Sequence, residues 1–136
     1  MTLYREAHKQ ISFQQSLDQQ LPDTLFDREQ IKRVIINLLE NAIAAIAGEG
    51  TIRLESYYNH ELKIITITVA DSGCGIPAED KERLFEPYFS TKKTGTGLGL
   101  AIVSTIIADH NGYIRIRDNK PKGSLFIIEL PATDRR

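Results

Sequence analysis

The sequence has few of the features that mark a chain for secretion, for a membrane or for nonspecific contact with nucleic acid. Its one cysteine cannot form an internal disulfide, which fits a reducing compartment. Seventeen basic and 18 acidic residues leave a net charge of −1, so no positive excess predicts nucleic-acid binding. No apolar run approaches the length of a membrane span, and no signal peptide is recognisable. We expect a cytoplasmic chain without nucleic-acid or membrane contacts.

Internal repeats and low-complexity tracts are also lacking. The 136 residues are 41% hydrophobic and 26% charged, which is the composition of an ordinary globular domain. A single domain of this length can bury a substantial hydrophobic core. The composition therefore predicts one folded domain, and only the motifs can indicate its function.

Two glycine clusters organise the middle of the sequence. The first, residues 73–75, follows an apolar run that ends at Asp71, and the second, residues 95–99, follows Lys92 and Lys93. Glycine lets a backbone approach a ligand closely, and the helix predicted after the second cluster would offer its N-terminus to an anion. A P-loop has its lysine after the glycines, and a dinucleotide fingerprint has a hydrophobic strand directly before them, so neither motif fits. We predict a phosphate site at the second cluster, with ligand-free turns as the alternative for either cluster.

A long amphipathic helix is predicted in the first half of the chain. Asp27 and Gln30 form a capping box at its start, and Gly48 stops it. Its apolar stripe has helical spacing and consists of Ile31, Val34, Ile35, Leu38, Leu39, Ala42, Ile43 and Ile46.

Two amides, Asn37 and Asn41, stand one turn apart at the rim of this stripe. Their side-chain oxygens suit Mg²⁺, which takes one or two protein oxygens together with substrate phosphates. The alternative is that both amides cap a neighbouring loop. Glu40 lies further from the stripe and is expected to face solvent.

Period-two patterns predict strands on both sides of this helix. The predicted strand segments are a first strand with Ile11, Phe13, Gln15 and Leu17 on one face, a hairpin of residues 51–58 and 63–70, and a final hairpin of residues 113–117 and 124–130. Asp71 has the parity of Ile65, Ile67 and Val69, so its carboxylate ends a buried row and needs a hydrogen-bond donor. An adenine amino group would serve, and a cap on the following turn is the alternative.

The remaining segments carry weaker signals. A short helix is predicted from Pro77 to about Leu84, and another from about Gly97 to His110, with Asn111-Gly112 as its cap. Side chains expected to serve structure alone are Cys74 as a small packing residue, His8, His60 and His110 at the surface, and the aromatics Phe85, Tyr88 and Phe89 in the core.

With these stretches in place, the chain resembles the ATP-binding catalytic domain of two-component sensor histidine kinases. The superfamily of that domain includes gyrase, Hsp90 and MutL. The matching stretches are the asparagine box Asn37-Leu38-Leu39-Glu40-Asn41-Ala42, the first glycine box Asp71-Ser72-Gly73-Cys74-Gly75-Ile76-Pro77, the phenylalanine box Leu84-Phe85-Glu86-Pro87-Tyr88-Phe89, the second glycine box Gly95-Thr96-Gly97-Leu98-Gly99-Leu100 and the terminal strand Gly123-Ser124-Leu125-Phe126. Residues 87–93 look most like sensors of the nitrogen-regulation, NtrY-like type.

The resemblance implies a fold and domain limits. The fold would be α/β, a two-layer sandwich known as the Bergerat fold, with a mixed sheet and helices packed on one face. Residues 11–131 would form the catalytic domain. Residues 1–10 would end a linker from an upstream dimerisation domain, and residues 132–136 would be a tail.

The resemblance also implies a site. Asp71 would accept a hydrogen bond from the adenine amino group, Asn41 would ligate Mg²⁺ with Asn37 close by, and residues 90–97 would form a lid over ATP. Phe85 and Phe89 would anchor that lid. The implied ATP-binding residues are Asn37, Asn41, Asp71, Gly73, Gly75, Ile76, Phe85, Phe89, Lys92, Lys93, Thr96, Gly97, Leu98, Gly99 and Leu100, with Asn37, Asn41 and Lys92 as the catalytic set.

The implied reaction transfers the γ-phosphoryl group of ATP to a histidine. That histidine would lie on a dimerisation domain of the same kinase, with the receiver domain of a response regulator as an indirect partner. No histidine here has an acceptor-box context. The alternatives are a conformational ATPase, a serine kinase of the anti-sigma type and a binding module without catalysis. The first two carry an acid one turn before the metal-binding asparagine, where this chain has Asn37, and an amide cannot act as a general base.

Overall fold

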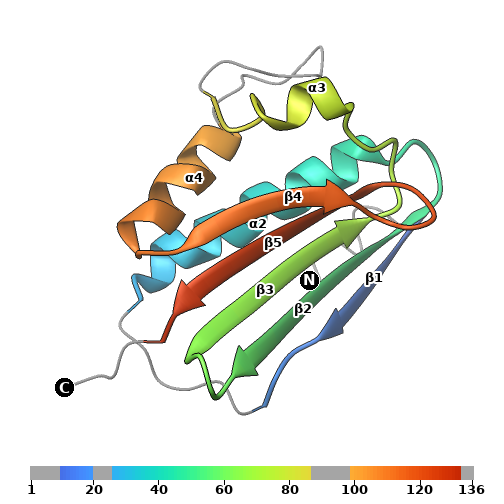
Figure 1. Cartoon of the computed structure of the whole chain (residues 1–136). Helices are drawn as coiled ribbons and strands as arrows, with labels where there is room; N and C mark the ends of the chain where they lie inside the picture. The colour runs from blue at the N-terminus through green and yellow to red at the C-terminus, as the bar shows by residue number, and fades with distance from the viewer. Residues whose placement is uncertain (1–9, 20–25, 87–98, 133–136) are drawn as a thin grey trace.

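A computed structural model describes residues 10–19, 26–86 and 99–132, which form a five-stranded mixed sheet with helices on one face (Figure 1). The strands are β1 (Ile11–Ser16), β2 (Gly50–Asn59), β3 (Ile64–Asp71), β4 (Tyr113–Asp118) and β5 (Ser124–Pro131), and the helices are α2 (Arg28–Ala45), α3 (Ala78–Lys81) and α4 (Gly99–Asp109). Their order in the sheet is β1-β2-β3-β5-β4. Only the β1–β2 pair is parallel among the described strand pairs. The predicted two-layer α/β arrangement is confirmed.

The core lies between the sheet and the helices α2 and α4, and Figure 1 shows α2 behind the strands and α4 at the left beyond β4. In β5, alternate residues from Ser124 to Leu130 are buried, as expected for a strand with one covered face. The helices contribute one buried stripe each, consisting of Val34, Leu38, Leu39 and Ala42 from α2 and Val103, Ile106 and Ile107 from α4. The predicted apolar stripe of α2 therefore faces the core.

The ends of both long helices follow from local chemistry. Asp27 caps α2, because its Oδ1 accepts a hydrogen bond of 3.1 Å from the backbone N–H of Gln30. At the end of α4, Asn111 takes a φ of 61°, and the N–H of Gly112 donates to the carbonyl of Ile107 at 2.9 Å. This closes the helix in the Schellman manner, with Asn111 rather than Gly112 in the left-handed position.

Two details of the predicted elements are wrong. Leu17 does not share the buried face of the first strand, because β1 ends at Ser16 and Leu17 is 47% exposed. The side chain of Asp18 then turns back to accept from the N–H of Tyr58 at 2.8 Å. The helix predicted from Pro77 to Leu84 is a single turn, after which i→i+3 hydrogen bonds such as Glu86 N–H to Arg83 O continue as turns.

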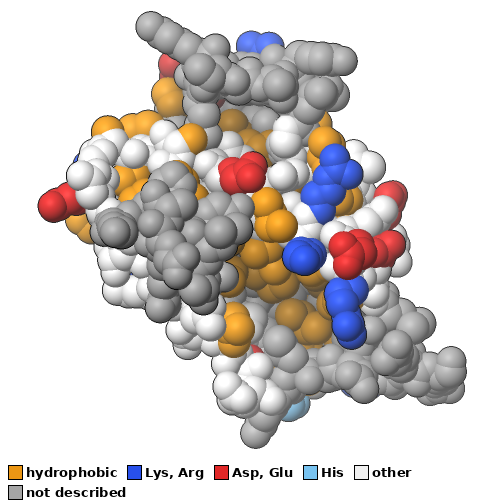
Figure 2. All heavy atoms as spheres, turned by 180° about the vertical axis from the view of Figure 1, so that it is seen from behind, with side chains coloured by type: hydrophobic (Ala, Val, Ile, Leu, Met, Phe, Trp, Pro, Cys, Tyr) orange, Lys and Arg blue, Asp and Glu red, His pale blue; other side chains and the backbone are white. Residues whose placement is uncertain are grey.

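The helix side of the molecule is hollowed. Figure 2 shows apolar side chains at the bottom of this hollow, with Lys and Arg side chains along one flank. Among the apolar residues of α2, Ile31, Ile35 and Ile43 remain half-buried.

No helix in the described part of the chain combines the length and apolarity that a membrane crossing needs.

Candidate functional site

Asp71 is the last residue of β3, and its carboxylate is buried, with 2% of the residue exposed. Its Oδ1 accepts from the N–H of Gly73 at 2.8 Å and from the N–H of Ser124 at 3.3 Å. The turn cap considered from the sequence is therefore present. A carboxylate offers about four acceptor positions, so these two bonds are compatible with a further donor from a ligand.

The first glycine turn packs on the end of α2. The backbone N–H of Cys74 donates to the carbonyl of Ala45 at 3.0 Å, and a Cβ on Gly73 would come within 2.4 Å of the same oxygen. Gly75 has a φ of 77°, which requires glycine for a different reason. The cluster thus serves the fold as well as any ligand, because Gly73 allows a close approach and Gly75 allows a turn.

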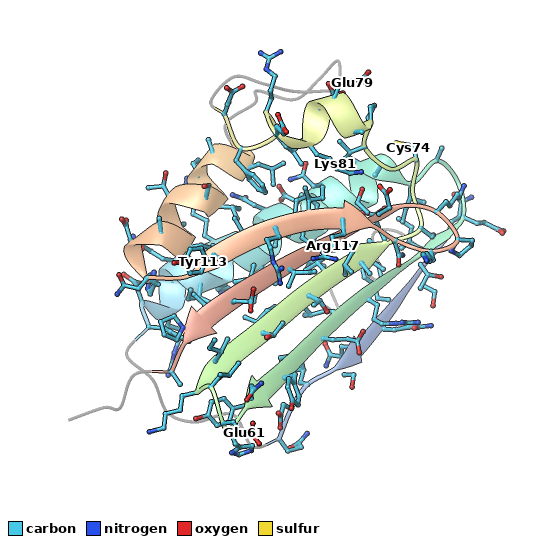
Figure 3. All side chains as sticks on the ribbon, in the orientation of Figure 1. Glu61, Cys74, Glu79, Lys81, Tyr113 and Arg117 are labelled. Carbon is cyan, nitrogen blue, oxygen red and sulfur yellow. The ribbon has the colours of Figure 1, made fainter. Side chains whose placement is uncertain are left out.

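Cys74 does not pack in the interior, so that prediction is wrong. The residue is exposed, and Figure 3 shows it in the turn after β3 at the end of the sheet nearest α3. Gly73 is buried against the end of α2, and the backbone N–H of Cys74 binds the same helix while the residue itself stays exposed.

Asn37 and Asn41 lie half-buried on α2, and Asn37 faces the start of α4. The side-chain Nδ2 of Asn37 donates to the carbonyl of Gly99 at 3.3 Å, and Nδ2 of Asn41 donates to the carbonyl of Asn37 at 3.1 Å. The NH₂ end of each amide is thus directed at the backbone, so an amide oxygen is the atom that suits a cation. The structure therefore brings the asparagine box to the second glycine box. Glu40 is exposed, as expected.

The donor chemistry of this pair fits a nucleotide-borne Mg²⁺. Such an ion takes only one or two protein oxygens and completes its shell with phosphate oxygens and water. Within residues 10–19, 26–86 and 99–132, no three His, Cys, Asp or Glu side chains gather in a way that would hold an ion without a nucleotide.

Gly99 is the first residue of α4, and a Cβ built on it would meet none of the atoms of the described residues within 4 Å. The N-terminal end of a helix offers unpaired N–H groups to an anion. Leu100 and Ile76 are half-buried against the core, and the ring of Phe85 meets Phe126 edge-on with centroids 6.4 Å apart. Ile76, Phe85 and Leu100 thus contribute apolar side chains that pack against the core from three elements of the proposed site.

Several predicted residues lie outside the described part of the chain. They are Phe89, Lys92, Lys93, Thr96, Gly97 and Leu98, together with the rest of the predicted lid, residues 90–97. Asn37, Asn41, Asp71, Gly73, Gly75, Ile76, Phe85, Gly99 and Leu100 are described. Asn37 contacts Gly99, Asn41 contacts Asn37, and the first glycine turn contacts the end of the same helix α2.

Sequence reasoning missed two polar contacts. Asn119 in the β4–β5 turn donates to the carbonyl of Asp71, and His110 binds the start of α2. His110 is half-buried, so its prediction as a surface residue is wrong. A helix end and a turn are ordinary places for these residue types, and only the folded arrangement reveals their partners.

Comparison with known proteins places these features in a family. Residues 26–134 match the model of the histidine kinase-, DNA gyrase B- and HSP90-like ATPases. The sensory histidine kinase/phosphatase NtrB of Rhodobacter capsulatus is 43% identical over 125 residues. That match covers 84% of this chain and 35% of NtrB, so the chain spans about a third of that relative's length.

Solved structures agree with the sequence relatives. The catalytic domain of histidine kinase ThkA has a TM-score of 0.84 and 39% identity, with 97% of this chain and 87% of that chain covered. The full-length kinase ShkA, solved in complex with AMPPNP, has a TM-score of 0.82 and 28% identity over 98% of this chain and 28% of its own. ThkA has also been solved in complex with the response regulator TrrA, at a TM-score of 0.80 and 36% identity over 97% of this chain and 38% of that one.

Proposed function

This chain belongs to the histidine kinase-, DNA gyrase B- and HSP90-like ATPase family, and we propose that it transfers the γ-phosphoryl group of ATP to a histidine on a separate dimerisation domain. It is the catalytic ATP-binding domain of a sensor histidine kinase, since its named relatives are sensor histidine kinases and its structural neighbours include the catalytic domain of ThkA. In the proposed assignment, residues 11–131 are this domain, residues 1–10 end the linker from the dimerisation domain, and residues 132–136 are a tail. The setting is the cytoplasmic part of a two-component sensor.

The presence of an amide, Asn37, one turn before Asn41 favours transfer to a histidine over hydrolysis. Its NH₂ donates to the carbonyl of Gly99, at the contact between α2 and α4. An amide cannot remove a proton from water, so the chain lacks at this position the general base that a conformational ATPase or an anti-sigma-type kinase would use. Phosphoryl transfer to a histidine relies on positioning and electrostatic stabilisation instead.

The adenine end of the proposed site is built around Asp71. The carboxylate accepts from the adenine amino group while Gly73 and Ser124 hold it in place. Gly75 and Ile76 line the same end, next to the half-buried apolar residues of the core.

The phosphate end is built from α2 and the start of α4. An oxygen of Asn41 ligates Mg²⁺, with Asn37 close to the metal and the phosphates. The ion supplies positive charge to the β- and γ-phosphates. The remaining proposed residues are Gly97, Leu98, Gly99 and Leu100 at the start of the helix, Lys92, Lys93 and Thr96 against the triphosphate, and Phe85 and Phe89 at the base of the lid.

The partner that receives the phosphoryl group is a histidine-bearing helical domain. The receiver domain of a response regulator is the indirect partner that accepts the group afterwards. The complex of ThkA with the response regulator TrrA supports a receiver as a partner of such kinases. His60 and His110 are occupied in the fold by contacts with Tyr58 and with both long helices, which makes either a poor acceptor.

The test supplies γ-labelled ATP and a panel of histidine-bearing dimerisation domains in trans. Label should appear on a matching partner, rise with its concentration and be labile to acid but stable to base. A partner whose acceptor histidine is replaced by glutamine is the control and should stay unlabelled. Acid-stable label on serine, or label on this chain with no partner present, would overturn the proposal.

A further inference from the structure

Asn119 joins the β4–β5 turn to the end of β3. Its Nδ2 donates to the backbone carbonyl of Asp71 at 2.8 Å across 48 residues of sequence, and its own N–H donates to the carbonyl of Gly123 at 2.9 Å. One residue therefore closes its own turn and also holds the backbone of the buried carboxylate.

The side-chain contact of Asn119 lies at the point where the regular pairing of β3 with β5 ends. On one side Asp71 pairs with Ile52 of β2, but on the other side the β3–β5 pairs end at Ala70 and Leu125. The β5 side of Asp71 is held instead by the amide of Asn119 and by the N–H of Ser124. The direction of the carboxylate depends on the backbone that these contacts fix.

The turn lies directly against the carbonyl that it holds. Gly123 has a φ of 106°, and a Cβ built on it would lie within 1.9 Å of the oxygen of Asp71. From the other side, Lys81 of α3 forms an ion pair of 2.7 Å with Asp118, the residue before Asn119. Contacts on both sides of the turn therefore set the place of the Asn119 amide.

We propose that Asn119 is a positioning residue that sets the Asp71 carboxylate for recognition of the adenine amino group. The proposal rests on the role assigned to Asp71 in the proposed function. Asn119 does not touch the base. Its amide fixes the carbonyl of Asp71, so the carboxylate points in one direction before a nucleotide arrives, and specificity for adenine depends on that direction.

A purely structural role would affect all nucleotides alike, so base discrimination is the decisive readout. ADP carries the amino group, whereas inosine diphosphate has an oxygen acceptor in its place. Calorimetry on the 136-residue chain should show that Asn119→Ala weakens ADP binding by roughly 3- to 10-fold, the range of a net hydrogen bond. Its affinity for inosine diphosphate should stay at the parental value.

A matched control is Asn59→Ala. The Oδ1 of Asn59 accepts from the N–H groups of Glu61 and Leu62, both at 3.0 Å, in the β2–β3 turn. Figure 3 shows Glu61 at the end of the sheet opposite Cys74. This variant also loses an amide that orders a turn, but it should bind both nucleotides as the parent does.

A second variant covers the case in which Asn119→Ala does not fold. Asn119→Asp keeps the shape of the side chain but places an oxygen where the donor was, so it should lose the preference for ADP at least as fully. The role of Asn119 would be overturned if either folded variant preferred ADP over inosine diphosphate as strongly as the parent does. An equal loss of affinity for both nucleotides would also overturn it. A parent chain that binds both nucleotides equally would instead overturn the adenine role of Asp71.

Discussion

The ring of His110 accepts a hydrogen bond of 3.1 Å from the backbone N–H of Asp27, so residues beyond the end of α4 hold the N-cap of α2. The other ring nitrogen, Nδ1, lies 2.8 Å from the carbonyl of Ile106 and donates to it. This pair of contacts requires the tautomer with the proton on Nδ1. Phe26 packs edge-on against the same ring with centroids 5.8 Å apart.

We expect His110→Ala to lower the free energy of unfolding by about 1–2 kcal/mol, because it removes both hydrogen bonds and the ring contact. Urea denaturation of the nucleotide-free chain measures the change. His60→Ala is the control, since His60 is exposed in a turn and meets only the ring of Tyr58 among its described ring contacts. If His60→Ala lowered the free energy of unfolding as much as His110→Ala does, the stabilising role of the His110 contacts would be contradicted.

Asp71→Asn should reverse the preference for the base. Asparagine keeps an acceptor for the N–H groups of Gly73 and Ser124 but adds a donor, which opposes the adenine amino group. ADP affinity should fall by roughly 1.5–3 kcal/mol, the range for a hydrogen bond to a charged group. Inosine diphosphate, which presents an acceptor, should bind at least as well as it does to the parent.

Calorimetry with the two nucleotides decides this prediction, and a thermal melt of the variant guards against unfolding. Unchanged ADP affinity in a folded Asp71→Asn variant would discard the contact between this carboxylate and adenine.

Asn41→Ala should reduce the gain in ATP affinity that Mg²⁺ provides, while leaving metal-free binding close to the parental value. Loss of an oxygen ligand should cost about tenfold or more in metal-dependent affinity. Titrations with and without Mg²⁺ measure the difference. The control is Glu40→Ala, one residue away and exposed. If Asn41→Ala and the parent gain equally from Mg²⁺, Asn41 is not a ligand.

Two glycines with positive φ should differ sharply in their tolerance of alanine. Gly48 has a φ of 84°, and no described residue outside its chain neighbours has an atom within 4 Å of a Cβ built on it, so Gly48→Ala should cost only the backbone strain, about 1–2 kcal/mol. Gly123→Ala adds a collision with the carbonyl of Asp71 and should cost roughly 2–5 kcal/mol. Denaturation curves for both variants test the difference, and equal losses would mean that the turn can move away from β3.

Elements with a strong local signal were predictable from the sequence. The start of α2 follows from the cap at Asp27, and the two hairpins follow from period-two runs around polar turns. The burial of Asp71 also followed from parity with its neighbours in β3. The family resemblance then indicated which boxes would meet, and the contact of Asn37 with Gly99 agrees with it.

Contacts that depend on the order of the strands were not predictable. Asn119 reaches Asp71 only because β5 lies beside β3, and no local pattern states which strands are neighbours. His110 reaches Asp27 across 83 residues for the same reason, since the sheet sets how α2 and α4 lie together. The exposure of Cys74 depends on how the first glycine turn rests on α2.

The interior place of β5 in the sheet determines when this domain can assemble during its synthesis. β5 is last along the chain among the described strands, yet it lies between β3 and β4, which do not pair with each other. A nascent chain that has been translated only through Asp118 lacks the strand that joins these two. The ribosome must therefore release residues 124–131 before the sheet closes and Ser124 can reach Asp71. Nucleotide binding should begin only after this last pairing, so the nucleotide cannot guide the earlier steps of folding.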